Sequence, residues 1–102
     1  MKEDTIVALA TPAGVGAISI IRISGNKAFD ATDKFFSGKV KIKDSASHTI
    51  HYGDIKNQDG EHIDDVLVSV FKAPNSYTGE DSVEISTHGN PLITQKVIEL
   101  LI

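Results

Sequence analysis

Two charged side chains stand inside runs of residues that otherwise favour β-strands. Arg22 lies in "AISIIRISG" (17–25), and Glu84 lies in "DSVEIST" (81–87). A charge in such a run must find a partner, reach the rim of the sheet or meet a ligand, because an unpaired buried charge costs several kcal/mol. The residues alone leave three interpretations open: an ion pair between the two, two separate surface charges, or contact with a small molecule.

Side chains alternate between the two faces of a strand, and this places both charges. Arg22 shares a face with Ile18 and Ile20, and Glu84 shares a face with Ser86. We therefore take Arg22 and Glu84 as the candidate binding residues of the chain, and we assign no catalytic residue.

The loop "PNSYTGED" (74–81) precedes the strand that carries Glu84. Its Gly79 permits a positive φ, and its composition is typical of turns. A long polar loop that leads into a strand with a single carboxylate can form the edge of a small-molecule pocket. Tyr77 can stack on a planar ring there, although packing over the sheet edge explains it more simply.

Two other features of the sequence carry less weight. "TPAGVGAIS" (11–19) lacks the lysine and serine or threonine that end a Walker A loop, so we predict a tight turn. The four histidines, at positions 48, 51, 62 and 88, show no spacing that brings three ligands together, and we predict no metal site.

The composition limits the classes of partner. The 102 residues make one domain, and the net charge of −4 disfavours binding to the phosphates of duplex nucleic acid. In "GKVKIK" (38–43), three lysines alternate on one face of an expected strand, which favours a solvated protective edge over nucleic-acid contact. Without cysteine or a run of about 20 apolar residues, we expect a cytoplasmic protein with no membrane partner.

The strand signals are short, apolar and bounded by glycine or proline. The run at 17–25 is almost continuously apolar, which predicts a central strand covered on both faces. Asp59-Gly60 predicts a hairpin turn between two of the runs. The expected strands are 5–11, 17–25, 48–55, 64–73 and 81–87.

Two segments have helical periodicity. Residues 26–37 predict a helix capped by Asn26 and ended by Gly38, and Asn90-Pro91 begins a second helix. The fold class is therefore α+β, with helices packed on a mixed or antiparallel sheet. Since the second helical pattern still runs at Ile102, we expect a piece of a longer protein.

Taken together, "DTIVALATPAGVGAISIIRISG" and "APNSYTGEDSVEISTHGNP" resemble the amino-terminal domain of the MnmE (TrmE) family of tRNA-modifying GTPases. The middle of the chain, with "IHYGDI" and "IDDVLVSVFKA", follows the same pattern, so the resemblance covers nearly all of it. Ala13 and Asn90 stand where the family commonly has a second proline and a second glycine, and both differences fall in loops.

The resemblance implies a folate-binding fold, similar to the tetrahydrofolate-binding modules of one-carbon enzymes, that also forms homodimers. The implied ligand is 5-formyltetrahydrofolate, held in part by Arg22 and Glu84. A carboxylate offers two acceptors to the ring N–H and amino group of a pterin, in a charge-assisted contact. Arg22 would serve either the polar edge of the pterin or the side that bears the formyl group. Two further family contacts, both lysines, lie beyond Ile102.

In the family, a P-loop domain hydrolyses GTP with magnesium and potassium, and further helical domains accompany it. The resemblance implies that the full protein installs a 5-carboxymethylaminomethyl-type group on the wobble uridine of tRNA, with the flavoprotein MnmG (GidA) as partner. Residues 1–102 contain no P-loop motif, so we expect one folate-binding and dimerisation domain that is not catalytic alone. A purely structural dimerisation domain with an incomplete folate pocket remains the alternative, and an independent aminomethyl or methyl transferase of folate chemistry is a third possibility.

Overall fold

The computed structural model describes residues 5–11, 16–76 and 78–102. Two expectations fall wholly or partly outside these residues: the tight turn within 11–19, of which 12–15 are not described, and the contacts of Tyr77.

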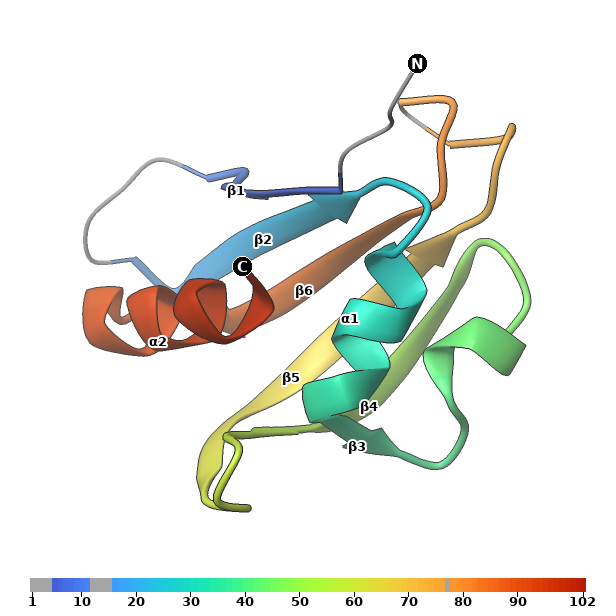
Figure 1. The fold of residues 1–102 in the computed structure, drawn as a ribbon. Helices are drawn as coiled ribbons and strands as arrows, with labels where there is room; N and C mark the ends of the chain where they lie inside the picture. The colour runs from blue at the N-terminus through green and yellow to red at the C-terminus, as the bar shows by residue number, and fades with distance from the viewer. Residues whose placement is uncertain (1–4, 12–15, 77) are drawn as a thin grey trace.

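In the described part of the chain, six strands form one sheet in the order β1-β2-β6-β5-β4-β3 (Figure 1). Every pairing between neighbours is antiparallel. The strands are β1 Ile6–Leu9, β2 Ile18–Ser24, β3 Phe36–Gly38, β4 Thr49–Lys56, β5 His62–Phe71 and β6 Ser82–His88.

Two α-helices, α1 Ala28–Phe35 and α2 Pro91–Leu101, lie on the same side of the sheet (Figure 1). The core forms between them and the strands, and Ile21, Val68, Ile85 and Val97 are fully buried there. This arrangement confirms the predicted α+β class with helices packed on an antiparallel sheet. The opposite side of the sheet carries no helix of the described chain, and we call it the open face.

The prediction that both faces of β2 are covered is wrong. The strand is interior to the sheet, since it pairs with β1 and with β6. On the helix side Ile21 and Ile23 are fully buried, whereas Ile18 on the open face is 61% exposed. Its apolar run therefore supplies two different surfaces, one for the core and one exposed.

The predicted limits of the first helix are also wrong. Lys27 takes the N-cap position without a side-chain hydrogen bond, so Asn26 is not the cap. Phe36 is already extended and begins β3, opposite Ile55 of β4. Because this pairing buries the Phe36 ring, strand formation replaces the last helical turn, and Gly38 ends β3 instead of the helix.

The expected strand of alternating lysines does not form after β3. Residues Ile42–Asp44 make a short 3-10 helix, and Ile42, its first residue, is fully buried. The carboxylate of Asp33 accepts hydrogen bonds from the backbone N–H groups of Ile42 (2.7 Å) and Lys43 (3.1 Å). Burial of this isoleucine and the Asp33 cap favour a turn over an edge strand, so the lysines do not share one strand face.

The hairpin and the second helix form as predicted. Gly60 has φ +80° in the turn between β4 and β5, a conformation that favours glycine. At the start of α2, the Asn90 side chain accepts the Leu92 N–H at 2.8 Å, and Pro91 occupies the first turn.

Candidate functional site

Arg22 and Glu84 lie directly opposite each other on the neighbouring strands β2 and β6. Both Nη2 (2.6 Å) and Nε (3.0 Å) of Arg22 donate to Oε2 of Glu84. The two side chains are 34% and 26% exposed, so the pair is partly shielded from water. Of the interpretations that the sequence leaves open, the ion pair is the one that forms.

The flanking residues explain why both charges reach the open face. Ile21 and Ile23 on either side of Arg22, and Ile85 beside Glu84, are fully buried under the helices. Strand alternation then directs Arg22 and Glu84 to the opposite side. The apolar residues that flank these charges in the sequence therefore fix their orientation.

The Glu84 carboxylate retains one oxygen with unused hydrogen-bonding capacity. Oε2 accepts two N–H groups from Arg22, whereas Oε1 accepts none from the residues that the structure describes. A carboxylate has about four acceptor positions, so two remain on Oε1. Oε2 already accepts two N–H groups, so a ligand that contacts both oxygens competes with Arg22 for Oε2.

A pocket of about 550 Å³ adjoins Glu84 on the open face. Residues 74–76 of the predicted loop form one side of it, and the other lining residues come from two strands, β5 and β6, and from the position just before β4. The lining consists of His48, Phe71, Pro74, Asn75, Ser76, Ser82 and Glu84. Arg22 is not among these residues, so the structure places it behind the carboxylate, on β2.

Asp81 holds the loop that borders this pocket. Its carboxylate accepts the Ala73 N–H at 2.9 Å, and its backbone oxygen accepts the Gly25 N–H at 2.9 Å. The hydroxyls of Ser24 and Thr78 lie 2.8 Å apart and add a second link to β2. The loop is thereby fixed to the same strand that carries Arg22.

Sequence reasoning missed His48 and Phe71 as lining residues. The Asp59-Gly60 signal indicated the hairpin but not its register, and it is the register, which pairs Thr49 with Val70, that brings positions 48 and 71 close together. The rings meet edge to face, with centroids 5.4 Å apart.

A second polar constellation joins β5 to the end of β6. Asp64 is buried, and its carboxylate accepts the backbone N–H of His88 at 2.9 Å and lies 2.7 Å from Nδ1 of that ring. The His88 side chain is 70% exposed. The contact between Asp64 and His88 could not be predicted from the sequence, because the two residues lie 24 positions apart in the chain.

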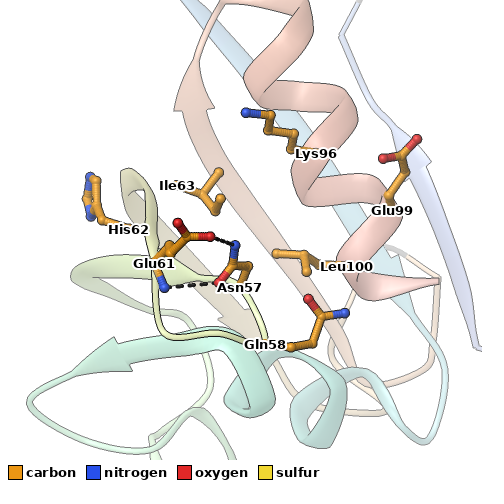
Figure 2. A pocket seen from close by; sticks show the side chains of 8 residues that line it. All are labelled: Asn57, Gln58, Glu61, His62, Ile63, Lys96, Glu99 and Leu100. Carbon is orange, nitrogen blue, oxygen red and sulfur yellow. Dashed lines mark hydrogen bonds between the residues drawn. The ribbon is translucent and has the colours of Figure 1, made fainter.

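Another pocket, of about 450 Å³, lies between the β4–β5 turn and the last turns of α2 (Figure 2). Lys96, Glu99 and Leu100 line it from the helix. The turn uses its own polar groups, because Asn57 donates to Glu61 Oε1 at 2.8 Å and accepts the Glu61 N–H at 3.0 Å. None of its lining residues is shared with the Glu84 pocket.

Within the ranges 5–11, 16–76 and 78–102, no cluster of three or more His, Asp or Glu side chains is arranged to hold a metal ion. No helix in these ranges is both long and apolar enough to cross a bilayer.

The chain is similar to a well-populated family. The family model described as "GTP-binding protein TrmE N-terminus" matches residues 5–102. A tRNA modification GTPase MnmE from Acholeplasma laidlawii is 53% identical over 102 residues, which cover 100% of this chain and 22% of that relative. The MnmE of Christiangramia forsetii is 56% identical over 104 residues, covering 98% of this chain and 21% of that relative.

The chain thus spans about a fifth of the length of the relatives it matches. The match of the family model and the identity above 50% leave one assignment: the chain belongs to the MnmE (TrmE) family and corresponds to its N-terminal domain.

Proposed function

We propose that this chain is the folate-binding and dimerisation module of a tRNA-modifying GTPase, with 5-formyltetrahydrofolate as its ligand. The observation that supports the proposal is the Arg22–Glu84 pair on the open face, next to a pocket of about 550 Å³. Ion pairs that remain in contact with water stabilise a fold by less than about 1 kcal/mol. Stability alone therefore gives little reason for this pair, whereas binding of a ligand would give it a role.

The residues present fit a pterin. The pocket volume of about 550 Å³ falls within the range of roughly 300 to 1,000 Å³ typical of small-molecule sites. Phe71 and Pro74 supply apolar surface for a flat ring, and Oε1 of Glu84 supplies an open acceptor. The pyrimidine edge of a pterin carries adjacent N–H donors, which match a carboxylate.

Glu84 and Arg22 then have different roles. Glu84 accepts hydrogen bonds from the ring N–H and the exocyclic amino group. Arg22 orients the carboxylate and neutralises its charge, since it contacts Glu84 and does not line the pocket. Arg22 is therefore a positioning residue in this proposal, and a bidentate pterin contact takes over one of its hydrogen bonds to Oε2.

The open face also suits a second copy of the chain. Five large apolar side chains on it are between 46% and 67% exposed: Ile6, Ile18, Ile50, Tyr52 and Leu67. Contiguous exposed apolar surface is typical of protein interfaces. A homodimer that pairs these faces would also cover the Glu84 pocket.

The remaining activity belongs to the whole protein. Relatives of about five times this length are named tRNA modification GTPases. We place GTP, magnesium and potassium in the part of the protein outside this chain. Action on the wobble uridine of tRNA, the MnmG-type flavoprotein partner and a cytoplasmic location also belong to the full protein.

Isothermal titration of 5-formyltetrahydrofolate into the 102-residue chain tests the folate assignment. We expect Glu84→Ala to weaken binding by at least about tenfold, because a charge-assisted contact contributes about 1.5 to 3 kcal/mol. Glu80→Ala is the matched control, since it removes an exposed carboxylate from the loop that leads into β6. Equal binding by Glu84→Ala and the wild type would reject the assignment of Glu84.

A structural dimerisation domain without folate binding is the second candidate, and the exposed apolar side chains of the open face favour it. Sedimentation and titration on the same sample separate the two. A dimer that binds no folate at millimolar ligand supports this second candidate for the chain.

A further inference from the structure

His48 occupies an unusual position at the edge of the Glu84 pocket. Its φ is +63°, in the left-handed region that side chains other than glycine rarely adopt. Its backbone N–H is bonded to the Val70 oxygen at 2.6 Å, and its ring packs edge to face on Phe71. The chain therefore holds this imidazole in place at a backbone conformation that costs free energy, and such outliers concentrate at binding sites.

The hydrogen bonds of Ser47 assign the protons of the His48 ring. Ser47 Oγ accepts the Lys72 N–H at 2.8 Å and lies 2.9 Å from Nδ1 of His48. We assign the hydroxyl proton to Nδ1, because it has no other acceptor among the described residues. In the neutral ring the remaining proton is then on Nε2, and in the charged ring Nε2 also carries a proton. Nε2 is thus a donor in either state.

Nε2 has no hydrogen-bond partner among the residues that the structure describes, whose ranges are 5–11, 16–76 and 78–102. It lies on the edge of the ring away from Ser47. His48 and Glu84 both line the pocket, and with this proton assignment their unused groups are of opposite kind: an acceptor at Glu84 Oε1 and a donor at His48 Nε2. They come from β6 and from the residue before β4, which are separated by one strand, or about 10 Å between backbones.

A pterin displays the complementary pattern along one edge. The amino group and the ring N–H are donors, and the carbonyl oxygen beside the N–H is an acceptor. With both donors on Glu84, the carbonyl is at the next position along the edge. The geometry points to His48 as a specificity residue whose Nε2–H donates to the ring carbonyl at position 4, so that the site selects 4-oxo over 4-amino pteridines. This inference rests on the folate-binding function proposed above.

Paired substitutions of His48 test the contact. Asn retains an amide near the position of Nδ1 and tolerates the left-handed conformation, but it has no donor at the position of Nε2. Gln has a donor near Nε2. We expect His48→Asn to weaken binding of 5-formyltetrahydrofolate about five- to tenfold, and His48→Gln to remain within about twofold of wild type. Thermal unfolding of both variants establishes that they are folded under the conditions of titration.

A ligand series separates recognition of the carbonyl from general effects on the pocket. The ratio of the Kd of a 4-amino folate analogue to that of its 4-oxo counterpart is measured for the wild type and for His48→Asn. Effects of Glu84 and of the protonation of the ligand are common to both proteins and cancel in the comparison. We expect the ratio to fall at least about threefold in His48→Asn. In the wild type the Nε2–H donor of His48 faces the 4-amino donor of the analogue, and the substitution removes this unfavourable contact.

The outcomes also distinguish this inference from the function on which it rests. If the wild type binds no folate, or Glu84→Ala binds normally, the proposed function fails. If wild type and Glu84→Ala behave as expected but the ratio is unchanged in His48→Asn, the role of His48 alone is overturned. Equal losses in His48→Asn and His48→Gln would also contradict a donor at Nε2.

Discussion

At the level of single residues, the contribution of the Arg22–Glu84 ion pair to stability can be distinguished from its contribution to binding. Both side chains keep about a quarter to a third of their surface in water, at 34% and 26%. Water screens such pairs, and their measured contributions to folding are small. We expect this pair to contribute little to the fold, and the proposal above assigns it to ligand recognition, because it fixes a carboxylate beside a pocket.

Arg22→Ala tests this separation. We expect the free energy of unfolding to change by less than about 1 kcal/mol in urea denaturation. Folate affinity should fall several-fold in calorimetric titration, because the Glu84 carboxylate is no longer oriented. Arg22→Lys keeps the charge but removes the paired N–H groups, and it should recover only part of the affinity. A large loss of stability with unchanged affinity would show that the pair is structural.

At the scale of elements, the junction between β2, β6 and α2 depends on close backbone contact. A Cβ on Gly89 would stand 2.0 Å from the backbone oxygen of Gly16. The Gly16 N–H also donates to the Gly89 oxygen at 3.0 Å, and Asp64 holds the neighbouring His88 N–H at 2.9 Å. Glycine at position 89 thus allows β6 to pass close to the start of β2 before α2 begins.

Gly89→Ala should therefore destabilise the domain by about 2 kcal/mol or more, because backbone must move to admit the methyl group. Gly16→Ala is the matched control: a Cβ there meets nothing within 4 Å, and we expect a change below about 0.5 kcal/mol. Thermal unfolding followed by circular dichroism measures both. Similar melting temperatures for the two variants would contradict the close contact.

Residues close together in the sequence were enough to predict several structural features. The Asp59-Gly60 turn, the Asn90 cap and the alternation around Arg22 and Glu84 each depend on nearby residues, and the structure confirms them. The errors arise where distant contacts outweigh local preference. Phe36 leaves the helix because β4 buries its ring, and the open face of β2 depends on where both helices pack.

The candidate site divides in the same way. Strand period and resemblance selected Arg22 and Glu84, and the structure brings them together. His48 and the pairing of Asp64 with His88 depend on strand register, which pattern alone did not supply.

At the scale of the whole molecule, the two sides of the sheet differ in character. The helices cover one side, while the open face exposes apolar side chains such as Ile50 and Tyr52, each 67% exposed. A helix-free sheet face with this surface suits association with a second copy, as proposed above.

Leu67→Asp on the open face should weaken self-association at least about tenfold, because a charge would be desolvated at the centre of the interface. Sedimentation velocity over a range of concentrations measures the change. Leu92→Asp is the control, since Leu92 on α2 is 73% exposed and away from the open face. Equal weakening by both substitutions, or by neither, would place the interface elsewhere.

The most direct test of the central claim is a crystal structure of the domain with 5-formyltetrahydrofolate bound. We predict that the pyrimidine edge of the pterin lies within about 3 Å of the Glu84 carboxylate, in the pocket bordered by Phe71 and residues 74–76. Arg22 should still contact the same carboxylate from β2. A pterin bound on the helix side of the sheet, or an Arg22–Glu84 pair left untouched by the ligand, would contradict the account.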